Sequence, residues 1–133
     1  MASKAVHDAV NARLEAVWTA TPVKGLNQYS DPDTPFLVVE YPYSASEQLT
    51  FGSPGNNVIR EQGSIRMAFR VETGSGVEDA LAWADQLAAL FRNQRFDGVR
   101  TFVPTTPVFD DQNVQGAYYE VSFAVPYQLD FTG

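Results

Sequence analysis

A stretch rich in glycine and asparagine, GSPGNNVIREQG at positions 52–63, could in principle hold a phosphate group. A Walker-type loop needs the pattern G-x-x-x-x-G-K-[ST] at the start of a helix, because backbone amides, the lysine and the helix N-terminus bind the anion. No such lysine occurs here, and the residues that follow have the pattern of a strand. A dinucleotide fingerprint fails for the same reason. We therefore predict a long β-hairpin loop, and long loops often carry a contact function.

His7 is the only histidine, so a cluster of histidine metal ligands is excluded. Nothing marks a serine nucleophile, such as a G-x-S-x-G elbow, and we expect a surface histidine. One alternative stays open from the residues alone, a small hydrolase or ligand-binding α+β domain. That alternative predicts a concave pocket in which His7 is hydrogen-bonded to a serine or a carboxylate.

The carboxylates gather only weakly, as Asp31 with Asp33 and as Asp110 with Asp111. Neither pair matches the D-x-[DN]-x-[DN]-G pattern of an oxygen-ligand metal loop, and aspartate is common in turns. The chain has no cysteine, which excludes disulfides and thiolate metal sites. We therefore expect no catalytic residue, no bound metal and no cofactor.

A charged strip surrounds the strand that follows the loop. Its members are Arg60, Glu61, Arg66, Arg70 and Glu72. They could form a contact surface for a partner, or simply the solvated face of a sheet, and the second interpretation is the commoner one. The aromatic residues near the C-terminus are expected to pack in the core rather than to stack on nucleobases, because no basic residues lie among them.

Composition limits the remaining functions. The 133 residues suit a single domain, here 1–133, and the net charge is −7 with nine basic and sixteen acidic residues. Tight nucleic-acid binding depends on basic residues that displace counterions, so we do not expect it. No apolar run is long enough to span a membrane, and the N-terminus lacks the layout of a signal peptide. A protein made and assembled in a cytoplasm is expected.

The hydrophobic pattern predicts an α+β domain with the element order α-β-β-β-α-β-β-β. A stripe through Val6, Val10 and Leu14 predicts a first helix, capped by Ser3 and ended before Pro22. A second helix is predicted to reach about Arg92, with a capping box formed by Ser75 and Glu78. Strands are predicted at 36–43, 46–51, 65–72, 99–103, 107–111 and 118–129, with a turn at 112–116. Pro126 suggests an edge strand or a bulge, and both helices are expected on one face of a largely antiparallel sheet.

Five segments together resemble the tail-terminator-like proteins of long-tailed bacteriophages, of which the lambda-type tail terminator has a similar element order. The segments are HDAVNARLEAVW, PFLVVEYP, EQLTFGSPGNNVIREQGSIRMAFRV, ALAWADQLAALFR and GAYYEVSFAVPYQ. The resemblance spans almost the whole chain and rests on pattern and order rather than on a catalytic motif. A head–tail connector or other neck protein is the nearest alternative.

The resemblance implies a virion structural protein without a reaction or a cofactor. Its copies would form a hexameric ring that caps the tail tube protein at the head-proximal end of the tail, ends tube polymerisation and docks the head connector protein. The ring would assemble in the host cytoplasm, and double-stranded DNA would pass through it without specific binding. The loop from Gly52 to Gln62 then becomes a candidate contact with a neighbouring subunit or the tube. Its candidate residues are Gly52, Ser53, Pro54, Gly55, Asn56, Asn57, Arg60 and Glu61.

Overall fold

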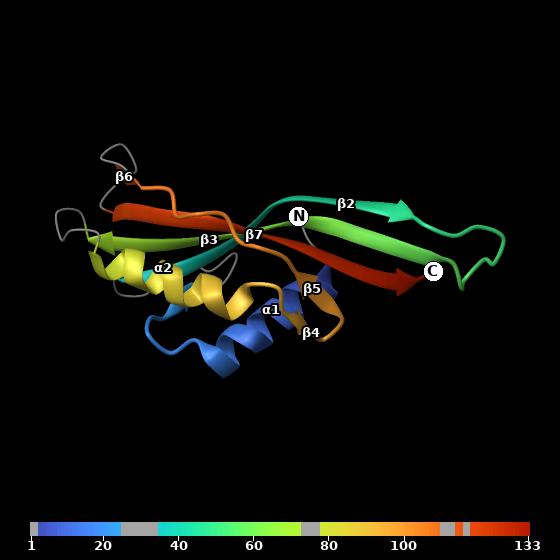
Figure 1. The fold of residues 1–133 in the computed structure, drawn as a ribbon, viewed down its shortest axis with the longest axis horizontal. Helices are drawn as coiled ribbons and strands as arrows, with labels where there is room; N and C mark the ends of the chain where they lie inside the picture. Colours follow the sequence, from blue (N-terminus) through green and yellow to red (C-terminus); the bar gives the residue numbers. More distant parts are fainter. Residues whose placement is uncertain (1–2, 25–34, 73–77, 110–113, 116–117) are drawn as a thin grey trace.

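The computed structural model describes residues 3–24, 35–72, 78–109, 114–115 and 118–133. The elements, in chain order, are α1 (Lys4–Val17), β1 (Val23–Lys24), β2 (Phe36–Gln48), β3 (Val58–Glu72), α2 (Glu78–Phe91), β4 (Arg95–Phe96), β5 (Val99–Thr101), β6 (Val114–Gln115) and β7 (Tyr118–Thr132). They form one sheet in the order β1-β2-β3-β7-β5-β4, and β6 pairs with β7. All pairs are antiparallel except β1 with β2. Both helices lie on one face of the sheet (Figure 1), so the predicted α+β architecture is confirmed.

The apolar stripes of the two helices form one side of the core. In α1 the predicted residues Val6, Val10 and Leu14 are buried together with Ala9. In α2 the buried side is rich in alanine, which lets the helix approach the sheet closely. The hydroxyl of Thr101 donates to the carbonyl of Phe91 at the end of α2. The second predicted helix is confirmed as α2, which ends at Phe91. Ser75, predicted as part of its cap, lies outside the described residues.

The pairing of β3 with β7 is the longest in the sheet and runs without a break from Val58↔Thr132 to Glu72↔Tyr118. Because side chains alternate along a strand, the odd-numbered residues of both strands face the helices. The core-facing residues are Ile65, Met67, Phe69, Val71, Val121, Phe123, Val125, Tyr127 and Leu129. The period-two pattern therefore predicted the correct face of both strands.

Pro126 does not lie on an edge strand or in a bulge of the β3 pairing, so that prediction is wrong. β7 has β3 on one side and β5 on the other, and Pro126 lies opposite Ser64 in an unbroken register. Its carbonyl accepts a 3.0 Å hydrogen bond from the Phe102 nitrogen, just after β5 ends at Thr101. The carbonyl and nitrogen of a residue point to the same side of an antiparallel strand. The missing N–H therefore faces the side on which the neighbouring strand has ended.

Three other strand predictions differ from the structure. The strands expected at 36–43 and 46–51 are one strand, β2, whose register shifts between Glu40 and Tyr43. Pro42 lies in that irregularity and cannot donate to a ladder, which accounts for the break in pattern. The strand expected at 107–111 contributes only the bridge Val108↔Ser122 to the described residues. The turn expected at 112–116 includes β6 instead.

One end of the sheet extends beyond the helices as a three-stranded arm, seen at the right of Figure 1. We define the arm by its paired segments 44–48 of β2, 58–63 of β3 and 127–132 of β7, with residues 49–57 as its tip. At the base of the arm, β5 pairs with β7 from Val99↔Leu129 to Thr101↔Tyr127. The candidate loop therefore lies at the far end of a projecting, strand-built support.

Candidate assembly surface

The tip of the arm is held in shape by its own hydrogen bonds. Gly52 and Gly55 have φ angles of +89° and +85°, a backbone conformation that residues other than glycine rarely adopt. The buried amide oxygen of Asn57 accepts from the Ser53 nitrogen at 3.1 Å. The hydroxyl of Thr50 accepts from the Val58 nitrogen at 2.8 Å. The loop therefore presents its side chains in a defined arrangement.

The exposed apolar side chains of the arm are concentrated around this tip. Phe51 is 80% exposed, more than any other large apolar side chain of the described residues. Leu49 and Phe131 on the arm are also exposed, and so is Tyr43, just before the β2 segment of the arm. The twelve residues between Glu47 and Arg60 carry no charged side chain, in a chain of net charge −7. A neutral apolar end on an otherwise charged protein is a surface suited to contact with another protein.

Arg60 and Glu61, predicted as loop contact residues, lie in β3 instead, because the strand begins at Val58. Arg60 forms a two-bond ion pair with Asp130 across the arm, with Nε–Oδ1 and Nη2–Oδ2 distances of 2.8 and 3.1 Å. Glu61 points to the opposite face of β3 and is only 4% exposed. Arg60 and Glu61 therefore belong to the strand that supports the tip, and a role of either residue in contact with a partner stays a prediction.

The buried carboxylate of Glu61 joins three distant parts of the chain. Its Oε2 accepts from the hydroxyl of Tyr127 at 2.7 Å and from the backbone nitrogen of Ser3 at 3.1 Å. Burial raises the pKa of Glu61, but the hydrogen bonds from Tyr127 and Ser3 outweigh it, and the pKa lies below its ordinary value. Burial and the nearby carboxylate both raise the pKa of Tyr127, so its hydroxyl stays a donor. The start of α1 is thereby fixed to the base of the arm.

Gly63 has no side chain, which leaves room for the Tyr43 carbonyl and the Tyr127 ring to lie close to its Cα atom. A Cβ atom at this position would lie 2.4 Å from the Tyr43 carbonyl oxygen and 2.8 Å from the Tyr127 hydroxyl. Ser3 was predicted to cap α1 through its side chain, but it forms no side-chain cap hydrogen bond. The backbone N–H of Ser3 is used by Glu61 instead.

The arginines of the charged strip lie on the face of the sheet away from the helices and pair with carboxylates of neighbouring strands. Arg66 reaches Glu40 at 2.7 Å and also contacts Glu120, and Arg70 reaches Glu120 at 3.2 Å. Opposite charges on neighbouring strands stabilise a sheet in this way. Since each arginine of the strip has a carboxylate partner, the solvated-face interpretation is the better supported one.

His7 lies beside Asn11, Asp8 and Tyr41 in the part of the chain that the structure describes. Its Nδ1 lies 3.4 Å from the Asn11 amide nitrogen and 3.8 Å from an Asp8 oxygen, and its ring packs at a tilt against Tyr41. The described residues contain no group of three or more histidine, cysteine, aspartate or glutamate side chains placed to hold a metal. Asp31, Asp33, Asp110 and Asp111 lie outside the described residues.

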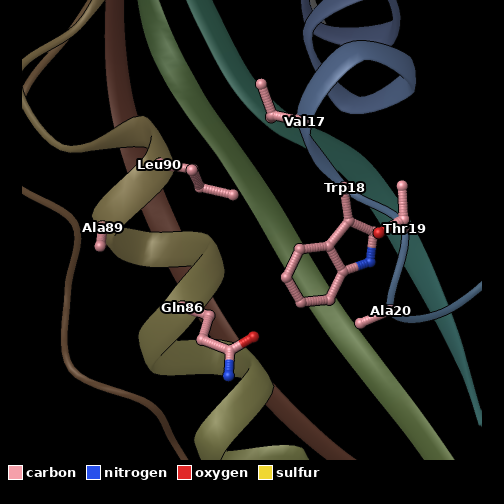
Figure 2. A pocket seen from close by; sticks show the side chains of 7 residues that line it. All are labelled: Val17, Trp18, Thr19, Ala20, Gln86, Ala89 and Leu90. Carbon is pink, nitrogen blue, oxygen red and sulfur yellow. The ribbon is translucent and has the colours of Figure 1, made fainter.

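A groove lies between the end of α1 and α2 (Figure 2). Its lining residues are Val17, Trp18, Thr19, Ala20, Gln86, Ala89 and Leu90. None of them is ionisable, and His7, which the hydrolase alternative placed in a concave pocket, is not among them. This groove was not predicted, since it depends on the packing of two helices that are distant in the chain.

Comparison with known proteins places the chain in a family. The family model described as "Phage tail terminator protein" matches residues 5–127. The chain belongs to the phage tail terminator family. A solved structure that carries only a sequence identifier as its name is 20% identical, with a TM-score of 0.63, over 100% of this chain and 99% of its own. That likeness supports the fold. A search of curated proteins finds no match.

Membership of the tail terminator family assigns a structural role in phage tail assembly, and a place in the virion tail. It agrees with the family resemblance found in the sequence. Within the described residues of this tail terminator, neither α1 nor α2 has the length and apolar composition needed to cross a membrane. The projecting arm and the helix groove are two candidate surfaces for assembly.

Proposed function

We propose that six copies of this tail terminator form a ring on the head-proximal end of the tail tube. The ring stops further addition of tube protein and presents its other face to the head connector protein. The observation that carries the proposal is the family match over residues 5–127, joined to an arm whose tip is apolar and uncharged. A protein without a reaction acts through such surfaces, and ring contacts join two different patches of the same chain.

Electron microscopy of the purified protein mixed with tail tubes tests this function. We expect rings at one end of each tube, and tubes that stop growing when the protein is added during polymerisation. Native mass spectrometry of the capped ends would give the number of copies. Binding to a portal-side adaptor with no effect on tube length would contradict the proposal and favour a neck protein instead.

The charge of the chain supports a ring through which DNA slides. Double-stranded DNA carries one negative charge per about 1.7 Å of helix axis, and six acidic subunits would surround it. Nine basic against sixteen acidic residues leave little to displace counterions from the phosphates. We expect no retention of duplex DNA on a filter at a salt concentration of about 150 mM. Retention that decreases steeply with added salt would overturn this part of the proposal.

A further inference from the structure

Two uncharged surfaces lie apart on this molecule, one on the projecting arm and one on the helical face (Figure 1). One is the arm tip, residues 49–57, with Phe51 80% exposed. The other is the groove between α1 and α2, which has a volume of about 380 Å³. That volume falls within the range of about 300–1,000 Å³ over which protein pockets enclose drug-sized molecules. The groove therefore has room for a phenyl ring and its neighbours.

The groove is built in advance of any contact. Figure 2 shows Leu90 of α2 extending toward the indole ring of Trp18. The Trp18 Nε1 donates to the Thr21 hydroxyl at 2.9 Å, which fixes the ring. Arg13 donates to the Leu90 carbonyl through Nε and Nη2, at 3.1 and 2.7 Å, and so ties the two helices together. A preformed site and a preformed tip lose little conformational entropy on association.

A chain cannot place its own tip in its own groove. The Ser3–Glu61 hydrogen bond fixes the start of α1 at the base of the arm. From there the 14 residues of α1 span about 21 Å, because each helical residue rises about 1.5 Å. Trp18 follows the far end of that helix, and the arm projects away from the helices (Figure 1). The tip can therefore reach a groove only on another molecule.

We propose that the arm tip of one copy, led by Phe51, inserts into the α1–α2 groove of the next copy. In a chain of net charge −7, contacts between copies are favoured where both surfaces are neutral. The tip and the groove lining meet that condition, since neither carries an ionisable side chain. A contact that joins two different patches also repeats head to tail, and it forms a ring where the rotation between copies closes. The inference rests on the proposed ring and names the contact that holds it together.

The lack of native cysteine allows this contact to be trapped directly. Ser53→Cys places a thiol beside Phe51 without removing the phenyl ring. In separate chains, Ala20→Cys and Gln86→Cys place a thiol at the groove. The matched control is Ala5→Cys, an exposed α1 position outside the groove. Equimolar mixtures are oxidised, and the covalent dimers are counted on a non-reducing gel.

We expect Ser53→Cys to crosslink to at least one groove position about tenfold more than to the Ala5→Cys control. Adding Phe51→Asp to the Ser53→Cys chain should abolish the excess, whereas Phe51→Leu should keep most of it. A chain that carries both cysteines should give a ladder of head-to-tail multimers. Crosslinking no greater than the control at both groove positions would overturn the inference. So would protection of the Ser53→Cys thiol from alkylation by tail tubes alone, since that would assign the tip to the tube.

Failure of this contact and failure of the proposed function give different results. If tube ends are still capped but no groove crosslink forms, the tip-to-groove contact is wrong and the ring uses other surfaces. If the crosslinks form but tubes grow without limit, the contact stands and the capping function is wrong.

Discussion

The hydroxyl of Tyr127 donates a 2.7 Å hydrogen bond to the buried carboxylate of Glu61. The two residues lie on neighbouring strands at the base of the arm, and the same carboxylate also accepts from the Ser3 nitrogen. Three segments far apart in the sequence therefore meet at one oxygen atom. This meeting point links the start of α1 to the base of the arm, while the apolar stripe of α1 packs into the core.

Glu61→Gln should destabilise the fold in a pH-dependent way. At pH 7 we expect a loss of about 1–3 kcal/mol, the usual contribution of a hydrogen bond to a charged buried group. The folded-state pKa of Glu61 lies below the ordinary value of 4.5. Its stabilisation is therefore complete above about pH 4.5 and is lost as the pH falls through the folded value. Urea unfolding across this range should show the two proteins converging in acid.

The matched control for this change is Glu15→Gln, at an exposed position on α1. It should follow the wild-type curve at every pH. A Glu61→Gln protein as stable as wild type at pH 7 would contradict the assigned role of the carboxylate.

Gly63→Ala should strain the base of the arm. The added Cβ would lie 2.4 Å from a backbone oxygen, so the β2–β3 register or the Tyr127 ring must shift. Overpacking of this kind costs about 1–3 kcal/mol. Gly133→Ala is the control, because its Cβ would meet only the flexible end of Ile59 at 3.1 Å. Thermal unfolding of both variants checks the prediction, and equal melting temperatures would contradict it.

The parts of the fold that depend on local pattern were predictable. The helical stripes and the alternation from Ile65 to Val71 identified the buried faces, because each depends only on the spacing of apolar residues. The start of β3 at Val58 was missed. Its first residues are largely polar, and their strand geometry comes from pairing with β2 and with β7, more than 60 residues away.

The candidate site was predictable only in part. The tip was found from its glycines and asparagines, which mark a turn at any position in a chain. The burial of Glu61 was not predictable, since its donors come from residues 58 and 66 positions away. The groove was missed for the same kind of reason, because α1 and α2 meet only in the folded chain.

Loss of Arg66 and loss of Arg60, which form ion pairs with Glu120 and Asp130, should differ in their effect on stability. Arg66→Ala removes a partner of Glu120, which is 6% exposed, and a buried carboxylate that loses a hydrogen bond costs about 1–3 kcal/mol. Arg60→Ala breaks a pair with Asp130 that is open to solvent on both sides, so we expect a small, salt-sensitive change. Urea midpoints at low and high salt measure both. A larger loss of stability for Arg60→Ala than for Arg66→Ala would contradict the prediction that the Arg66 pair contributes more.

Asn57→Ala should separate the shape of the tip from the stability of the fold. The Asn57 amide oxygen holds the Ser53 nitrogen at 3.1 Å, and without it the tip samples more conformations. Ser53 is exposed, so water can replace the bond at its nitrogen, and we expect a cost of about 1 kcal/mol in urea unfolding. Docking of a disordered tip loses more conformational entropy, so crosslinking from Ser53→Cys to the groove should fall severalfold. Asn56→Ala, at an exposed neighbouring position, is the control and should leave the crosslink yield unchanged. Equal yields from the two variants would mean that the ordered loop contributes nothing to assembly.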